Sequence, residues 1–561
     1  MRIFAIALTA CLSLHAQEVS QSGLRLRAER PMINQPERAR HGMVTSVHEL
    51  ASLAGIEIMK KGGNAVDAAV AVGIALAVVH PEAGNLGGGG YMLIRMADGR
   101  SLAVDYKEVA PGVSKIGMFA KREEADIGYK ASAVPGTPAG LAMAHERFGK
   151  LPWKDVVEPA RRLAAEGFPA SQRMEIILKL QVPVMKQFPE TAKIFLQGSD
   201  QPLLQGELVK QPDLAKTLER MQKLGAREFY EGETARLIAA DMKANGGTIS
   251  YEDLKNYKAI ARTPLESTYR GHPVLAMPPS SGGGITLMMM LNILEQFTIP
   301  VGAEGSSLSR HLQAEAMRRA FRERGLHLAD PAFVPVDIPK LLSKDFAKSL
   351  ASNMRLDRAT PSAEIGKGES SGGNKSRETT HFSVIDKDGN IVSNTYTLNG
   401  FFGSQVIAKG TGVLLNDIMS AFSHDPKSKN VIAPGKRPLS SMNPTIVCRK
   451  DGTPWFALGS PGSQTIPNSI LNVIQNIIDF KMSLRDAVEY PRIHQQFEPD
   501  RIDAEPAALV LDVAEKLKAM GHKLNPRFRS QGDVHAVMVE DGTGMRLGWS
   551  DGRRGGKAFG Y

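Results

Sequence analysis

Two threonines, Thr379 and Thr397, stand at the open end of a predicted β-hairpin. Two runs rich in β-branched and aromatic residues flank Asp-Lys-Asp-Gly-Asn at 386–390, which consists of turn formers. If these five residues form the loop, Ile385 pairs with Ile391 and Thr379 lies opposite Thr397. Directly opposed residues have Cβ atoms about 4.5–5.5 Å apart, so we expect the two hydroxyls to meet.

The segment before the hairpin, residues 366–377, is polar and rich in glycine and has little to bury. Such a segment, leading directly into a strand that opens with a threonine, is the arrangement expected of a precursor that cuts its own chain. Cleavage of the Glu378–Thr379 bond would free the Thr379 α-amine. Its reference pKa of about 7.7–8 lets it serve as the base for its own hydroxyl. The alternative is an ordinary edge hairpin that follows a surface linker.

The amino terminus has the pattern of a secretory signal peptide. Met1-Arg2 carries a positive charge, residues 3–14 are apolar, and Ala16 offers a small residue for cleavage. We therefore predict a signal peptide over 1–16 and a periplasmic or secreted protein. Lipidation of Cys11 as a lipoprotein is the less favoured alternative. The longest apolar run elsewhere, 68–79, is shorter than the roughly 20 residues that cross a bilayer, so no membrane span is expected.

The remaining composition excludes several classes. The chain of 561 residues is 42% hydrophobic, which suits one large or two closely packed domains. Its net charge of +10 is scattered, without basic runs, so a nucleic-acid partner is not expected and a basic surface that attracts anionic solutes is favoured. Once Cys11 is removed, Cys448 has no partner for a disulfide and is predicted to be a buried thiol.

Predicted elements surround the hairpin. A capping-box pattern at Ser46–Glu49 predicts a helix to about residue 61, and Asn64–Asp67 caps a second, wholly apolar helix to 79 that belongs in a core. Glycines 87–90 precede a strand and permit close backbone approach. Further elements are predicted as follows: a strand ending at 105–108, helices over 135–260 and 285–297, strands near 412–416, 444–449 and 454–459, and a helix to about 478.

Two further stretches could complete a site with the threonines. Ser440-Ser441 follows a polar loop, and Gly462-Ser463 precedes a helix whose first amides are free to bind an oxyanion. Plain turn chemistry would explain either stretch alone. The sequence lacks HExxH, GxSxG, Walker A and dinucleotide fingerprints, so we predict no metal and no cofactor.

Taken together, these motifs resemble the γ-glutamyltransferase (glutathione hydrolase) family of N-terminal nucleophile hydrolases. The resemblance covers most of the chain after the signal. Its matching segments are 63–69, 80–90, 134–140, 277–283, 379–381, 386–390, 396–399, 414–416, 437–442 and 460–462.

The resemblance implies a four-layer αββα sandwich, cut between Glu378 and Thr379 into a large subunit (17–378) and a small subunit (379–561) that stay together. It also implies roles. Thr379 would be the nucleophile, and Thr397 would assist processing and catalysis. The substrate would be held at its amino end by Asn399 and at its α-carboxylate by Ser440 and Ser441. Backbone amides of Gly462 and Ser463 would form the oxyanion hole.

Four positions depart from the family pattern. Lys107 stands where the family usually has an arginine that binds the α-carboxylate; the charge is kept but the bidentate fork is lost. Ile418 and Ala421 replace the usual glutamine and aspartate that bind the α-ammonium. Asp417 lies nearby and is the candidate to substitute, although its side chain need not point the same way. Ser463 replaces a second glycine, which is harmless only if its φ is negative.

Three functions remain open on this evidence. The first is hydrolysis or transfer of γ-glutamyl groups from glutathione or a related amide, with water, an amino acid or a peptide as acceptor. The second keeps the acyl-threonine chemistry but takes a dicarboxylic acyl group without the α-amine, of glutaryl or oxamate type. The third is a binding protein without catalysis, which the intact Thr379, Thr397 and Asn399 disfavour.

Overall fold

The computed structural model describes residues 35–368, 378–526 and 530–561. The predicted signal peptide and most of the glycine-rich segment before the hairpin lie outside these residues. One compact unit spans Glu37–Tyr561. Its centre holds two seven-stranded antiparallel sheets.

The first, here called the hairpin sheet, has the predicted hairpin at its centre. In spatial order its strands are β21 (Lys557–Gly560), β2 (Gly42–Ser46), β10 (Glu378–Asp386), β11 (Ile391–Asn399), β3 (Gly89–Arg95), β4 (Ser101–Tyr106) and β7 (Ile260–Arg262). The second, the facing sheet, has the order β1 (Glu37–Ala39), β20 (Arg546–Ser550), β19 (His535–Val539), β15 (Pro454–Gly459), β14 (Thr445–Cys448), β9 (His272–Ala276) and β8 (Leu265–Tyr269).

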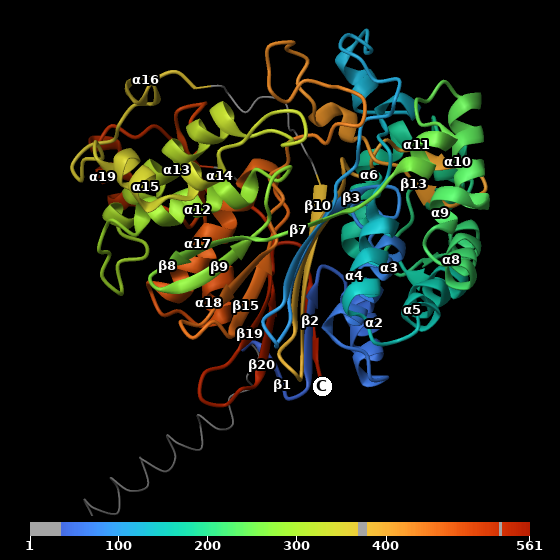
Figure 1. Ribbon diagram of the computed structural model, residues 1–561, viewed down its shortest axis with the longest axis horizontal. Helices are drawn as coiled ribbons and strands as arrows, with labels where there is room; N and C mark the ends of the chain where they lie inside the picture. Colours follow the sequence, from blue (N-terminus) through green and yellow to red (C-terminus); the bar gives the residue numbers. More distant parts are fainter. Residues whose placement is uncertain (1–34, 369–377, 527–529) are drawn as a thin grey trace, which may run out of the picture. The chain divides into compact units, whose positions relative to one another are not determined.

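Helices cover the outer face of each sheet, so that the unit has the predicted αββα layers (Figure 1). Against the hairpin sheet lie α2 (Glu49–Lys60), α3 (Ala65–Val79) and α4 (Thr137–Phe148), backed by α5 (Trp153–Glu166) and α8 (Pro212–Leu224). Against the facing sheet lie α12 (Gly283–Leu294) and α17 (Ile466–Ile478), with α13 (Ser307–His327), α14 (Ile338–Leu342), α15 (Lys344–Ala351) and α18 (Leu484–Glu489).

The smaller elements connect these layers. They are α6 (Gln172–Met185), α7 (Pro189–Phe195), α9 (Glu228–Glu231), α10 (Glu233–Ala244), α11 (Tyr251–Asn256), α16 (Ser362–Ile365), α19 (Leu511–Ala519), β5 (Phe168–Pro169), β6 (Leu208–Val209), β12 (Ile407–Ala408), β13 (Val413–Leu414), β16 (Ile493–His494), β17 (Ile502–Ala504) and β18 (Leu524–Pro526). Among the helices that the structure describes, none is both long enough and apolar enough to cross a membrane.

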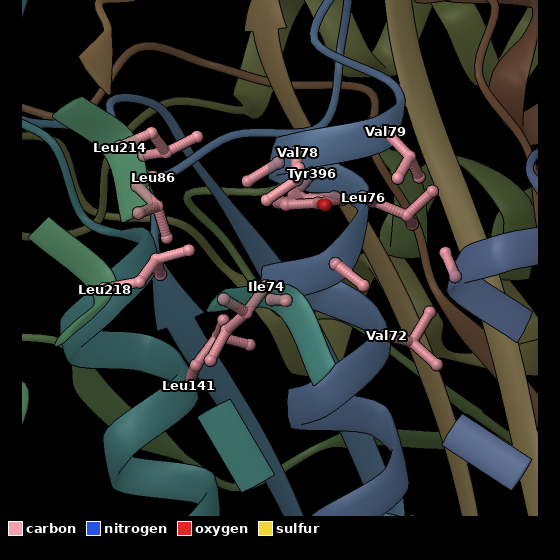
Figure 2. Close-up of a cluster of buried hydrophobic side chains, with 14 of the residues drawn as sticks. Val72, Ile74, Leu76, Val78, Val79, Leu86, Leu141, Leu214, Leu218 and Tyr396 are labelled. Atoms are coloured by element: carbon pink, nitrogen blue, oxygen red, sulfur yellow. The ribbon is translucent and has the colours of Figure 1, made fainter. Parts of the chain in front are cut away.

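Helix α3 fills the core behind the hairpin sheet, as its apolar sequence predicts. Asn64 and Asp67 form the predicted capping box, and all fifteen residues of the helix are buried. Figure 2 shows its side chains, among them Ile74 and Leu76, packed among Leu141, Leu218 and Tyr396. The Tyr396 hydroxyl donates to the Gly73 carbonyl at 2.8 Å, which ties the hairpin to this helix.

The hairpin sheet is buried on both faces, since every residue of β10 and β11 is covered. Val384 and Val392 enter the core behind the sheet, whereas Ile385 and Ile391 enter the core between the sheets. This alternation follows from the period of two along a strand. The catalytic candidates at the end of the hairpin are therefore held by a rigid, doubly packed scaffold.

The remaining predictions differ in detail. The helix predicted from Ser46 begins instead after His48, whose ring accepts the Leu50 amide, so the expected Ser46–Glu49 capping box is wrong. Ser46 Oγ lies 2.8 Å from Ser52 Oγ instead. Cys448 is a buried free thiol, as predicted, and burial raises its pKa to about 11.

Candidate active site

The hairpin register brings the two threonines together. Ile385 pairs with Ile391, as predicted, and the register holds to Thr380 opposite Tyr396. A one-residue shift then places Glu378 opposite Asn399, so Thr379 lies at a bulge. The two hydroxyl oxygens are nevertheless 3.2 Å apart. Bulges re-aim side chains and interrupt strand pairing, and this one lies at the bond that we expect to be cut.

Both hydroxyls converge on the carbonyl oxygen that precedes Thr379. Thr379 Oγ1 lies 2.7 Å from the Glu378 carbonyl oxygen, and the Thr397 hydroxyl donates to that oxygen at 2.6 Å. The Asn399 amide donates to Thr397 Oγ1 at 2.7 Å, which leaves the Thr397 proton directed at the carbonyl. Thr397 thus polarises the carbonyl that Thr379 would attack.

Close backbone approach supports this arrangement from β3. A Cβ at Gly88 would lie 2.2 Å from the Thr397 carbonyl oxygen, and one at Gly90 would lie 2.3 Å from the Tyr396 Cβ. Only glycine fits at either position. The glycine run that the sequence placed before a strand therefore lets β3 pack against the site half of β11.

A pocket opens beside Thr379 and gathers most of the predicted site residues. Seven of them line it: Thr379, Thr397, Asn399, Lys107, Ser440, Ser441 and Ser463. Its apolar lining comes from Ile418, Ala421, Leu439, Met442 and Ile466. The segments that contribute these residues lie up to several hundred positions apart in the chain. The fold therefore assembles a single cleft from separate motifs.

Lys107 is the one cation among the lining residues of this pocket. Its Nζ donates to Glu108 Oε2 at 2.6 Å, and both side chains are almost fully buried. The Lys107 carbonyl accepts from the Tyr257 hydroxyl, which fixes the chain after β4. A buried ion pair of this kind holds the ammonium in place, where a substrate carboxylate can add a second partner.

Asn399 and Asp417 meet at the wall of the pocket. Asn399 Nδ2 donates to the Asp417 carbonyl at 3.2 Å and to Ser420 Oγ at 3.1 Å. The Asp417 carboxylate accepts a hydrogen bond from the Gly400 amide at 2.7 Å. Asp417 is not among the residues that line the pocket. Burial raises the pKa of Asp417 to about 7. Its side chain therefore faces the backbone rather than the space beside Thr379.

The serine pair lies between the pocket and the facing-sheet helices. The Ser440 amide donates to the Ser280 carbonyl at 3.3 Å, and Ser440 Oγ accepts the Met442 amide. Ser441 Oγ accepts from Arg324 of α13 at 3.1 Å. Burial lowers the pKa of Arg324 to about 10. The Arg324 guanidinium adds positive charge behind the serines, which suits the binding of a carboxylate.

Gly462 and Ser463 form a sharp turn into α17. Gly462 has φ 130°, and Ser463 has φ 58°. The negative φ that would make the serine harmless is therefore not adopted. A serine held in the left-handed region carries backbone strain of about 1–3 kcal/mol, and such strain often accompanies functional sites. Ser463 lines the pocket, whereas Gly462 does not.

The side chain of Glu378 was not among the predicted site residues, yet it is closely bound beside Thr379. Its Oε2 accepts from Arg173 Nη2 at 2.6 Å, and its Oε1 accepts from Arg554 and, at 3.0 Å, from the Thr379 amide. Neither arginine lies in a motif that marks it, and no signal in the sequence pairs them. Only the fold brings them to Glu378.

The described residues include one cluster that could hold a metal ion, formed by His311, Glu315 and His522. His311 Nδ1 lies 2.8 Å from His522 Nε2, and the Glu315 carboxylate binds Arg318 and Arg319. These contacts already use the candidate ligand atoms. None of the three residues lines the pocket beside Thr379.

Comparison with known proteins identifies the family. The family model described as gamma-glutamyltranspeptidase matches residues 51–561. The glutathione hydrolase proenzyme of Escherichia coli (strain K12) is 42% identical over 520 residues, which cover 90% of this chain and 89% of that relative. The acylase ACY 1 proenzyme of Pseudomonas sp. (strain V22) is 38% identical over 522 residues, with 91% and 92% covered.

A solved structure supports the same assignment. The crystal structure of cephalosporin acylase from Bacillus halodurans superposes with a TM-score of 0.85 at 26% identity and covers 95% of this chain and 98% of that one. The αββα layers, the threonine pair at the head of the central hairpin and the family match agree. The chain belongs to the γ-glutamyltranspeptidase family and is an enzyme with the N-terminal nucleophile hydrolase fold.

Proposed function

We propose that this protein cuts its own chain before Thr379 and then hydrolyses or transfers γ-glutamyl groups through an ester on that threonine. One observation carries the proposal. The hydroxyls of Thr379 and Thr397 both contact the Glu378 carbonyl oxygen, at the edge of a pocket that also holds Lys107 and the serine pair. The glutathione hydrolase names of its relatives support the γ-glutamyl group as the acyl donor.

Self-cleavage begins when Thr379 Oγ1 attacks the Glu378 carbonyl carbon. The new C–O bond forms as the C–N bond breaks, and the hydroxyl proton passes to the departing nitrogen, which becomes the Thr379 amine. Water then hydrolyses the ester and leaves a carboxylate on Glu378 and a free hydroxyl on Thr379. Thr397 contributes by donating to the carbonyl oxygen as negative charge develops there.

In turnover, the Thr379 amine accepts the proton of its own hydroxyl as the oxygen attacks the substrate amide. The acyl ester forms and the amine leaving group takes up that proton. Water or an amino group then attacks the ester and restores Thr379. Backbone amides at Gly462 and Ser463 are the proposed oxyanion donors. Asn399, Lys107, Ser440 and Ser441 line the pocket and are the proposed substrate contacts, whereas Asp417, also predicted, binds the Gly400 amide instead.

The location and the subunits are also proposals. Residues 1–16 have the pattern of a signal peptide, which would place the enzyme in the periplasm or outside the cell. The proenzyme names of the relatives support a precursor that yields the subunits 17–378 and 379–561. Glutathione or a similar amide, with water, an amino acid or a peptide as acceptor, is the proposed small-molecule partner.

A second acyl donor is favoured by the lining of the pocket. Lys107 is its only charged lining residue, and Ile418 and Ala421 present apolar surface. An α-ammonium therefore has no carboxylate among the lining residues, and burying it unpaired is costly. A glutaryl-type acyl group has a distal carboxylate and no ammonium. The acylase relatives agree with this alternative.

Two experiments test these proposals. Thr379→Ala should leave a single full-length chain and no turnover, because both steps need its hydroxyl, whereas the control Thr380→Val should cleave and react normally. The Thr380 hydroxyl is buried without a hydrogen-bond partner. Two bands with full activity from Thr379→Ala would exclude the role.

The second experiment compares γ-glutamyl-p-nitroanilide with glutaryl-p-nitroanilide on protein confirmed to be cleaved. A higher kcat/KM for the γ-glutamyl compound supports the main proposal, and a higher value for the glutaryl compound replaces it with the second. Ala421→Asp places a carboxylate at the pocket and should raise the relative preference for the γ-glutamyl compound.

A further inference from the structure

We propose that Glu378 is a positioning residue for cleavage of the Glu378–Thr379 bond. Its carboxylate is bound between Arg173 and Arg554 and thereby holds the Glu378 carbonyl in contact with the hydroxyls of Thr379 and Thr397. The inference rests on the proposed self-cleavage and names a determinant of its rate. It assigns no role to Glu378 in turnover.

The Glu378 side chain is fully buried and ionically bound on both oxygens. Oε2 accepts from Arg173 Nη2 at 2.6 Å, and Oε1 accepts from Arg554 Nη1. Oε1 also accepts the Thr379 amide at 3.0 Å, the amide of the scissile bond itself. The side chain therefore restrains both the residue that carries the carbonyl and the nitrogen that departs.

Arg173 is also bound away from the clamp, whereas Arg554 contacts the two residues of the scissile bond, Glu378 and Thr379. Arg173 stands near the start of α6, where its Nε lies 3.5 Å from Glu82, and Glu82 pairs with His80 at 3.0 Å. Arg554 follows β20, and its Nη1 also lies 3.4 Å from the Thr379 carbonyl oxygen. The clamp thus joins α6 to the C-terminal end of the chain across the scissile bond.

A side-chain clamp is needed here because strand pairing is irregular at this point. The ladder between β10 and β11 shifts by one residue between Glu378 and Thr380. Backbone pairing alone therefore leaves the peptide unit before Thr379 without the regular ladder that holds the rest of β10. Attack requires a reacting oxygen and carbon held near contact distance in a narrow range of angles. The carboxylate clamp supplies that restraint from outside the sheet.

The clamp differs from the machinery already described. Thr379 and Thr397 act on the Glu378 carbonyl through their hydroxyls, whereas the Glu378 carboxylate touches the scissile amide nitrogen and two guanidinium groups. Truncating the carboxylate leaves both hydroxyls in place. It frees the torsions that orient the Glu378 carbonyl. Cleavage should therefore slow, but it should still proceed by attack of the Thr379 hydroxyl.

The test measures the rate of self-cleavage on gels after the folded precursor is isolated. We expect Glu378→Gln to cleave about tenfold more slowly than the natural chain, because it keeps an acceptor for the Thr379 amide but loses the charge. Glu378→Ala should slow cleavage at least a hundredfold. Because only the folded precursor is assayed, a slower rate reports the geometry of the scissile bond and not the yield of folded protein.

A matched control exists in α13. Glu315 is also buried and clamped by two arginines, Arg318 and Arg319, but it lies outside the pocket beside Thr379. Glu315→Gln should lower the unfolding temperature of the precursor and leave the cleavage rate of folded molecules unchanged. If Glu315→Gln slows cleavage as much as Glu378→Gln does, the clamp acts only through stability and the proposal is overturned.

Coupling between partners gives an independent readout. Arg554→Gln should slow cleavage, and adding Glu378→Gln should slow it little further, because both changes break the same contact. If the rate reductions of Arg554→Gln and Glu378→Gln multiply fully in the double variant, the clamp is contradicted. It is also contradicted if the Glu378→Ala precursor cleaves within threefold of the natural rate. Either result leaves the proposed role of Thr379 intact, whereas a natural chain that never cleaves would remove that role itself.

Discussion

The two ends of strand β10 each bury a carboxylate, but they bind it differently. At the turn, Asp386 accepts from the amides of Ala65, Asp388 and Asn390 and from the Asn390 side chain. At the other end, Glu378 is held by cations. The first set of partners consists of neutral groups within the turn and at the start of α3. The second consists of two guanidinium groups brought from remote elements, together with the neighbouring Thr379 amide.

This difference indicates that the turn end of β10 stabilises the fold, whereas the site end carries strained groups. The turn end is regular, fully bonded and docked on the start of α3. The site end has a bulge, a non-glycine residue with φ 83° at Asn399, a serine with φ 58° and an aspartate whose pKa is raised. Active sites often carry such costs, and the rest of the fold must offset them. Changes at the turn end should therefore destabilise, whereas selected changes at the site end should stabilise.

The largest effect is expected at the turn. Asp386→Ala leaves the Ala65 amide and the donors of the turn without their acceptor, and each buried unsatisfied group costs about 1–3 kcal/mol. The total loss should be about 4–6 kcal/mol, measured by chemical denaturation of the uncleavable Thr379→Ala background. The neighbour Asp388→Ala is the control, because its carboxylate is half exposed and makes only a 3.7 Å contact with Lys150. Equal losses from the two variants would contradict the assignment of stability to the buried turn.

The next effect separates chemistry from stability at the site end. Thr397→Val keeps the shape of the side chain but removes the donor to the Glu378 carbonyl oxygen. Loss of one such donor typically costs a factor of about 100–1,000 in rate. Self-cleavage should slow by that factor while the unfolding temperature changes by only a few degrees. A cleavage rate within threefold of the natural one would show that Thr397 is a structural neighbour only.

The sequence predicted the turn end of β10 almost completely. Alternating β-branched residues around a five-residue turn define the hairpin, and its period of two fixes the pairing of Ile385 with Ile391. The Asn64 capping box and the apolar run of α3 likewise follow local rules, because helix caps and wholly buried helices depend on neighbouring residues. Local information was sufficient wherever the partners lie close in the chain.

The site end was only partly predictable, because the missing parts have no local signal in the sequence. The meeting of the two threonines followed from the register, but the bulge that displaces Thr379 by one position did not. The clamp on Glu378 joins residues 205 and 176 positions apart in the chain, and no periodicity encodes such a contact. The positive φ of Ser463 is set by the packing of a turn, so the serine itself gave no sign of it.

A pH-dependent effect should follow from Asp417. Burial raises its pKa from the ordinary value of 3.8 to about 7 in the folded chain. The folded state therefore binds a proton more tightly than the unfolded state. The corresponding stability is fully present below about pH 4 and is lost as the pH rises through about 7. We expect this one group to remove about 2–4 kcal/mol over that window.

Asp417→Asn tests this assignment. The amide has no charge to bury, and its oxygen can still accept from the Gly400 amide. The variant should be more stable than the natural chain at pH 8 and similar to it at pH 4, as measured by denaturant unfolding at both values. A natural chain and a variant with parallel stability profiles between pH 4 and 8 would show that Asp417 does not titrate in this range.

The smallest expected effect, and the most direct test of strain at the site end, concerns Ser463. Its φ of 58° suits glycine, and relief of the strain is partly offset by the greater freedom of glycine in the unfolded chain. Ser463→Gly should therefore stabilise the protein by about 0.5–1 kcal/mol and keep the backbone amide that we propose binds the oxyanion. Ser463→Ala removes the hydroxyl but retains the strained φ, so it should give no gain. If alanine stabilises as much as glycine, the cost at this position lies in the hydroxyl, and the strain does not come from the backbone of the turn.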